Sequence, residues 1–125
     1  MSKVVSTPTL GQRQERFAHS LGLLLAYASK LGYGIRLREL SRTREQAERN
    51  AKAGVGIANS IHCDNLAIDL YITIDGNLFW SGEPYEELGR FWKGLSTPGY
   101  EHCWGGDFTR YNDCYHFSIA HGGRK

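Results

Sequence analysis

The sequence predicts an α+β domain in which a small antiparallel sheet packs against helices. Two observations lead to this prediction: apolar residues recur at helical spacing in long segments, and shorter segments show the alternation of strands. A length of 125 residues is that of one domain, so we expect residues 1–125 to form a single domain. Hydrophobic residues make up 41% of the chain and charged residues 22%, as in ordinary globular domains.

The first expected helix follows Thr9 and ends near Gly32. Thr9 and Gln12 have the spacing of a capping box, and glycine is a common helix stop. The apolar stripe of this helix is Phe17, Leu21, Leu24, Ala28 and Leu31. The next segment, "GIRLRELS", suggests a short strand, and a second helix is expected from near Thr43 to near Gly54.

The segment around Asp69 predicts the central strand of the sheet. Side chains alternate along a strand, so one face carries Leu66, Ile68, Leu70, Ile72 and Ile74. The other face carries Ala67, Asp69, Tyr71 and Thr73. Asp69 therefore does not interrupt the core, because it lies on the opposite face of the strand.

The chain then turns back and enters a further helix. "IDGNLFW" is a hairpin signal, since Asp-Gly favours the tight turns that join antiparallel strands. Pro84 fits the first turn of the following helix. The buried stripe of that helix is expected to be Leu88, Phe91, Trp92 and Leu95.

The C-terminal segment "CYHFSIA" repeats the layout of the Asp69 strand. Tyr115, Phe117 and Ile119 fall on one face, whereas His116 falls on the other, together with Ser118 and Ala120. Two strands therefore each present one potential metal ligand on the face away from the core.

Composition and charge exclude several classes of protein. A formal charge of +2 without a clustered basic face argues against nucleic-acid binding. The apolar run "LGLLLAYASKLGYGI" is too short and too interrupted to insert stably into a membrane. The first residues do not show the pattern of a classical signal peptide, so we expect synthesis in a reducing cytoplasm. We then expect three free thiols, Cys63, Cys103 and Cys114, and a single bridge between two of them is the alternative.

His62, Asp69 and His116 are a suitable set of protein ligands for a catalytic zinc. Such a zinc takes about three protein ligands and keeps one position for water. One carboxylate and two neutral imidazoles leave the ion with net positive charge, which lowers the pKa of bound water to about 7. Asp113 could act as the general base. A structural site that includes Cys63 or Cys114 is the competing interpretation, although no C-x-x-C pair is present.

Three blocks of the sequence resemble a family of zinc peptidases. "SIHCDNLAID" resembles the S-x-H-x-x-G-x-A-x-D signature of D-alanyl-D-alanine carboxypeptidases and phage L-alanyl-D-glutamate endolysins. "WGGDFTRYNDCYHF" resembles the second block of that family, and "SRTREQ" a weaker upstream block. The three blocks occur in the family's order. Three positions depart from the family pattern: Asn65 for glycine, Phe108 for tryptophan and Ser118 for an acidic or amide residue.

The resemblance implies roles for individual residues. His62, Asp69 and His116 would bind Zn²⁺, and Asp113 would be the catalytic base. Arg42 would bind a substrate carboxylate or stabilise the oxyanion. Ser60 would help to hold the loop that carries His62, and Gln46 would contact the substrate or the metal-binding residues. Gln46 could instead be the capping partner of Thr43, and Arg42 a solvated charge at the start of a helix.

The fold implied is that of the DD-peptidases and hedgehog-like domains, and the implied substrate is the peptidoglycan stem peptide. We expect a monomeric L-alanyl-D-glutamate endopeptidase of the phage endolysin type, made in the bacterial host cytoplasm and acting on the cell wall after release. A separate holin-like pore would then be needed. The alternatives are a D-Ala-D-Ala carboxypeptidase or dipeptidase, and a non-catalytic zinc-containing binding module.

Overall fold

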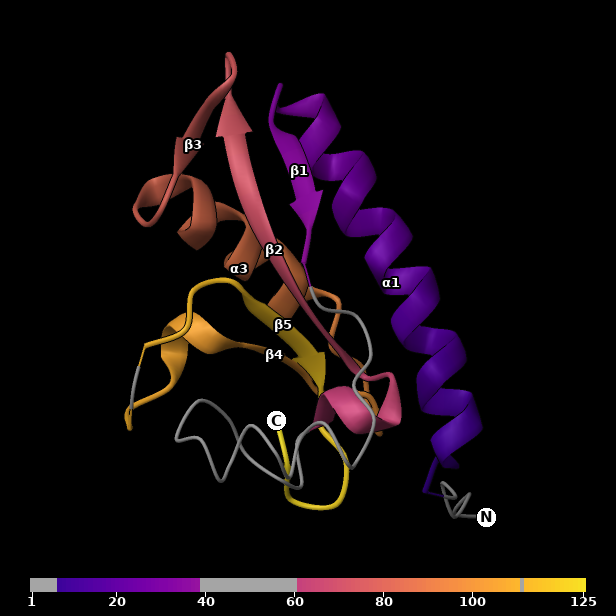
Figure 1. The fold of residues 1–125 in the computed structure, drawn as a ribbon. Coiled ribbons are helices and arrows are strands. Elements are labelled where there is room, and N and C mark those ends of the chain that lie inside the picture. The colour runs from indigo at the N-terminus through magenta and orange to yellow at the C-terminus, as the bar shows by residue number, and fades with distance from the viewer. Residues whose placement is uncertain (1–6, 39–60, 111) are drawn as a thin grey trace.

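The computed structural model describes residues 7–38, 61–110 and 112–125 and has the expected α+β architecture (Figure 1). An antiparallel sheet has the strand order β1-β2-β5-β4, and β3 forms a hairpin with β2. The elements are α1 (Leu10–Lys30), β1 (Gly34–Leu37), the 3₁₀ helix η1 (Ile61–Asp64), β2 (Ala67–Ile74), β3 (Asn77–Phe79), α3 (Glu83–Gly94), β4 (His102–Trp104), the 3₁₀ helix η2 (Gly105–Asp107) and β5 (His116–Ile119).

Helix α1 begins and ends where the sequence predicts. The Thr9 side chain accepts a hydrogen bond from the Gln12 backbone, and the Gln12 side chain accepts one from the Thr9 backbone, which completes the capping box. Gly32 follows the helix with φ +84°, a conformation that glycine adopts at little cost. Leu31 at the C-cap is 36% exposed, so the apolar stripe ends before the last predicted residue.

Strand β2 has the predicted two-faced character. Ile68, Leu70 and Ile72 are fully buried, whereas Asp69 and Tyr71 on the other face are half-buried. The hairpin to β3 turns through Asp75 and Gly76, which both have positive φ as tight hairpin turns require.

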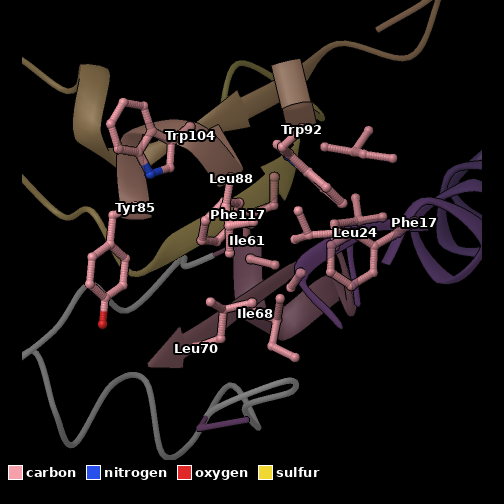
Figure 2. Close-up of a cluster of buried hydrophobic side chains, with 14 of the residues drawn as sticks. Phe17, Leu24, Ile61, Ile68, Leu70, Tyr85, Leu88, Trp92, Trp104 and Phe117 are labelled. Carbon is pink, nitrogen blue, oxygen red and sulfur yellow. The ribbon is translucent and has the colours of Figure 1, made fainter. Parts of the chain in front are cut away.

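The hydrophobic core lies between the helices and one face of the sheet. Figure 2 shows side chains of α1, α3, β2 and β5 pointing toward one another. Trp92 of α3 is at its centre: its ring packs edge-on against Phe17 and Phe117, and its indole N–H donates to the Ser118 carbonyl at 3.0 Å. A buried indole needs such a partner, because an unpaired N–H in the core is costly. The core therefore fixes the position of β5 relative to α3.

Two details of the fold were not predicted from the sequence. The side chain of Leu37 is 54% exposed, because β1 is an edge strand whose end does not reach the core. Strand β4 was not predicted. Only three residues form this strand, too few for alternation to be visible. The predicted helix from Thr43 to Gly54 lies outside the described residues.

A glycine of α3 allows the contact between this helix and β4. A Cβ atom built on Gly89 would lie 2.3 Å from the Trp104 ring, whereas one built on Gly94 of the same helix meets nothing within 4 Å. We expect Gly89→Ala to lower the free energy of unfolding by about 1–3 kcal/mol, the usual cost of overpacking. Gly94→Ala is the matched control and should be neutral or stabilising. Urea titrations of both variants test this, and equal effects would contradict it.

His102 of β4 is buried in its neutral form. Its Nδ1 lies 3.0 Å from the Tyr100 carbonyl, its Nε2 2.8 Å from the Ser20 hydroxyl, and its ring packs on Trp92. The carbonyl can only accept, so Nδ1 carries the hydrogen and Nε2 accepts from Ser20. Burial is the main cause that lowers the pKa of His102 below its ordinary value of 6.5.

This lowered pKa predicts how stability depends on pH. The unfolded chain binds a proton at His102 more readily than the folded chain, so its contribution is complete above about pH 6.5 and is lost as the pH falls through the folded-state pKa. In metal-free protein, the difference in unfolding free energy between wild type and His102→Asn should shrink below pH 6.5, by at most about 1.4 kcal/mol per pH unit. A difference that is constant from pH 8 to pH 5 would contradict this.

Candidate metal centre

The register of the sheet places two of the predicted ligands side by side. Strands β2 and β5 are antiparallel neighbours, and Asp69 lies directly opposite His116 in their ladder. Their side chains point away from the core, whereas the adjacent pair Ile68 and Phe117 points into it. Directly opposed residues in an antiparallel pair have Cβ atoms about 4.5–5.5 Å apart. The two strands therefore bring a carboxylate and an imidazole together.

The third predicted ligand comes from the short helix η1. His62 is only 5% exposed, and its ring packs edge-on against His116 with 5.3 Å between centroids. Asn65 directly follows η1 and has φ +56°, in the left-handed region that asparagine tolerates better than most residues. The Gln14 side chain of α1 donates to the Asp64 carbonyl at 2.8 Å and so attaches η1 to α1.

The three donor groups converge on one point. Nε2 of His62 and Nδ1 of His116 each lie 3.6 Å from Oδ1 of Asp69, and the three donor atoms lie within 4.8 Å of one another. A tetrahedral zinc with bonds of about 2.1 Å has ligand atoms about 3.4 Å apart, close to the observed spacing. Oδ1 of Asp69 is buried and has no hydrogen-bond partner among the described residues. Buried carboxylate oxygens are normally paired, so this arrangement fits a cation.

Electrostatics keep Asp69 ready to bind a cation. Burial favours the neutral carboxyl, but the facing imidazoles of His116 and His62 outweigh burial and lower the pKa of Asp69 to about 2. Asp69 is therefore ionised at any physiological pH. One negative charge and two imidazoles would leave a bound divalent ion with net positive charge, which is the condition for Lewis-acid chemistry.

Asp113 is held next to this group by a tight turn. The His116 backbone N–H donates to the Asp113 carbonyl at 3.1 Å, and the Asp113 N–H donates to the Gly105 carbonyl at 3.0 Å. A Cβ atom on Gly105 would lie 2.0 Å from the Asp113 carbonyl oxygen, so only glycine allows this approach. Burial, followed by the nearby Asp69 charge, raises the pKa of Asp113. A raised pKa suits a group that takes and returns protons near neutral pH.

A cavity of about 250 Å³ adjoins the donor group and is lined by Arg38, Asp69, Tyr71 and Tyr115. The Arg38 guanidinium stacks over the Tyr71 ring at 5.1 Å, and the Arg38 backbone N–H donates to the Asp69 carbonyl at 2.7 Å. The sequence analysis missed Arg38, because its closeness to Asp69 depends on the register of β1 and β2. Tyr71, on the same strand face as Asp69, also lines this cavity.

The remaining predicted site residues have different outcomes. Arg42, Gln46 and Ser60 lie outside the described residues, so their roles stay predictions. No disulfide joins any two of the three cysteines. Among the described residues, the group of potential metal ligands comprises His62, Asp69 and His116 and contains no cysteine. Cys114 instead directs its thiol toward the Trp80 carbonyl at 3.6 Å. The ring of Phe108, one of the departures from the family pattern, packs against His116.

Two solved structures share this architecture. Serratia marcescens L-Ala D-Glu endopeptidase ChiX matches with a TM-score of 0.68 at 18% identity, over 95% of this chain and 92% of that one. A mutant of the vancomycin resistance D,D-pentapeptidase VanY, from a VanB-type resistance cassette and in complex with Zn(II), matches with a TM-score of 0.57 at 20% identity, over 83% of this chain and 70% of that one. The chain has the fold of these two peptidases.

The sequence comparisons add no family assignment. No protein-family model matches the chain, and no curated protein sequence matches it significantly. Within the described ranges, no helix combines the length and the apolar character that a membrane span requires.

Proposed function

We propose that the protein is a zinc-dependent peptidase that cleaves the stem peptide of bacterial peptidoglycan, at the bond between L-Ala and D-Glu. The observation that carries this proposal is the convergence of His62, Asp69 and His116 on one point beside Asp113. The extent of the structural match supports the choice of bond, because this chain and the L-Ala D-Glu endopeptidase ChiX align over nearly their whole lengths.

Zinc bound by His62, Asp69 and His116 would supply a Lewis acid that lowers the pKa of a water molecule and polarises the scissile carbonyl. Asp113 accepts a proton from the attacking water while the oxygen of that water bonds to the scissile carbonyl carbon. The same carboxyl then gives a proton to the leaving amine as the C–N bond breaks. Burial and the nearby Asp69 charge raise the pKa of Asp113, which is the direction that favours a carboxyl group accepting a proton and returning it.

Arg38 is placed to bind an anionic group of the substrate. Its guanidinium lines the cavity next to Asp69 and is held there by the Tyr71 ring. Guanidinium groups bind carboxylates bidentately, and D-Glu carries a free carboxylate close to the scissile bond. We expect Arg38→Ala to raise KM about tenfold, which corresponds to about 1.4 kcal/mol of lost binding, and to change kcat less.

The matched control for Arg38→Ala is Arg16→Ala. Arg16 also stacks over a tyrosine ring, that of Tyr100, but lies outside the cavity. Steady-state kinetics on a soluble stem-peptide substrate should leave KM of Arg16→Ala unchanged. Equal KM values for wild type and Arg38→Ala would remove Arg38 from substrate binding.

Digestion of purified peptidoglycan tests the proposed bond. Mass spectrometry of the products should detect new N-terminal D-Glu, and a chelator should abolish the reaction. Released D-Ala would instead identify a D-Ala-D-Ala carboxypeptidase, the second candidate, which the match to the D,D-pentapeptidase VanY supports. Zinc binding without any cleavage would identify a binding module and contradict the peptidase proposal.

The biological setting is part of the same proposal. A monomeric phage endolysin that is made in the host cytoplasm would need a separate holin-like pore to reach the cell wall. Expression in bacteria with and without such a pore tests this, because lysis should follow only when both proteins are present. Lysis by the protein alone would contradict the need for a pore.

A further inference from the structure

The chain after β5 folds into a tight reversal, the C-terminal turn (His121–Lys125). The backbones of His121 and Arg124 exchange two hydrogen bonds of 3.0 Å, with Gly122 and Gly123 between them at φ +58° and +76°. Two consecutive residues with positive φ form the tight turn that glycine pairs favour. Figure 1 shows this turn bringing the C-terminus back toward η1.

The C-terminal turn contacts the helix that carries His62. The Arg124 guanidinium donates to the carboxylate of Asp64, the last residue of η1. This ion pair is largely buried, since the Arg124 side chain is 23% exposed and that of Asp64 14%. A charge-assisted bond at a buried position restrains its partners more strongly than an exposed pair does. Arg124 therefore restrains η1 two residues away from His62.

The same turn also contacts His116. The Lys125 backbone oxygen lies 3.2 Å from Nε2 of the His116 ring. This backbone oxygen carries no hydrogen and only accepts hydrogen bonds, so in the neutral imidazole Nε2 carries the hydrogen and donates it. The lone pair is then on Nδ1, the atom that faces Asp69. The contact selects the tautomer of His116 that can bind a metal.

We infer that the C-terminal turn positions two metal ligands at once: it restrains η1 through Arg124 and Asp64, and it orients His116 through the Lys125 backbone oxygen. The turn is itself attached to α1, because the Arg13 guanidinium lies 3.1 Å from Nδ1 of His121. Groups that orient metal-binding side chains typically change metal affinity by 10–100-fold when they are removed. This inference rests on the proposed metal site. It assigns a positioning role to a segment that would touch neither the ion nor the substrate.

Zinc affinity separates positioning of ligands from general support of the fold. We would measure the zinc dissociation constant by competition with a chromogenic chelator, for wild type, Arg124→Ala and Arg90→Ala. Arg90 is the matched control, because it forms an exposed ion pair with Glu83 in α3, away from the metal site. Arg124→Ala should weaken zinc binding about 10–100-fold, whereas Arg90→Ala should leave it unchanged.

A second pair of variants tests the turn without changing a charge. A Cβ atom on Gly123 or on Gly32 meets nothing within 4 Å, and both residues have positive φ, so alanine adds similar backbone strain at each. Gly123→Ala should weaken zinc binding and alter the visible spectrum of the Co²⁺-substituted protein. Gly32 follows α1 near the far end of β2, so Gly32→Ala should change neither zinc binding nor the Co²⁺ spectrum. Thermal unfolding of the metal-free proteins would show whether each variant is folded.

The outcomes distinguish this inference from the proposed function. Tight zinc binding by wild type that is unchanged in both Arg124→Ala and Gly123→Ala would overturn the role of the C-terminal turn and leave the peptidase proposal intact. Equal losses in Gly123→Ala and Gly32→Ala would also overturn it, because strain anywhere in the fold would then suffice. A wild-type protein that binds no zinc would overturn both.

Discussion

Replacing Asp113 by asparagine is expected to lower kcat about 10²–10⁴-fold, the usual contribution of a general acid–base group. Zinc content should not change, because Asp113 is outside the group of three converging donors. The physical reason is that an amide cannot take a proton from water, although it has nearly the shape of the carboxyl group. Cleavage rates on a soluble stem-peptide substrate, with zinc measured by mass spectrometry in the same samples, give both numbers.

The control for Asp113→Asn is Asp107→Asn. Asp107 lies in the neighbouring 3₁₀ helix η2, where its carboxylate pairs with Lys93 at 2.7 Å and is 51% exposed. Its replacement tests whether the loss of any carboxyl group from this region lowers the cleavage rate. We expect the cleavage rate of Asp107→Asn to equal that of wild type. Wild-type cleavage rates in Asp113→Asn would remove this residue from the mechanism and leave the base unassigned.

Replacing His62 by alanine is expected to remove zinc and activity together. Zinc sites with four protein ligands bind with about 10–16 kcal/mol, so one ligand contributes about 3 kcal/mol. That loss corresponds to a factor of about 100 in affinity. His62→Ala loses activity because it loses zinc, whereas Asp113→Asn loses the proton-transfer group. Excess zinc should therefore partly restore the activity of His62→Ala but not that of Asp113→Asn.

The control for His62→Ala is His19→Ala, which removes an exposed imidazole from α1. Zinc titrations of the two variants should separate them clearly. Stoichiometric, tight zinc in His62→Ala would contradict the ligand assignment and would indicate that other side chains bind the ion.

The sequence was sufficient to predict which faces of the strands carry the ligands. Alternation alone places Asp69 and His116 away from the core, and the fully buried Ile68 and Phe117 beside them agree with it. Alternation does not supply the register between strands. The direct opposition of Asp69 and His116 therefore appears only in the structure, as does the approach of Arg38 to Asp69.

Parts of the site that depend on backbone contacts could not be predicted. The contact between His116 and residue 125 is made by the backbone oxygen of Lys125 and not by its side chain, so no residue pattern reports it. Gly105 is similar, because its role is to leave room for the Asp113 backbone. Sequence reasoning is most reliable where side-chain polarity determines the structure, and least reliable where two backbones meet.

The central claim is that His62, Asp69 and His116 hold one zinc ion without sulfur. Zinc K-edge X-ray absorption of the stoichiometrically loaded protein tests it most directly, since Zn–N and Zn–O bonds are about 2.0–2.2 Å long and Zn–S bonds about 2.3 Å. We predict a four-coordinate spectrum with two imidazoles and oxygen in the remaining positions. A sulfur shell from Cys63 or Cys114, or protein that takes up no zinc, would contradict the claim.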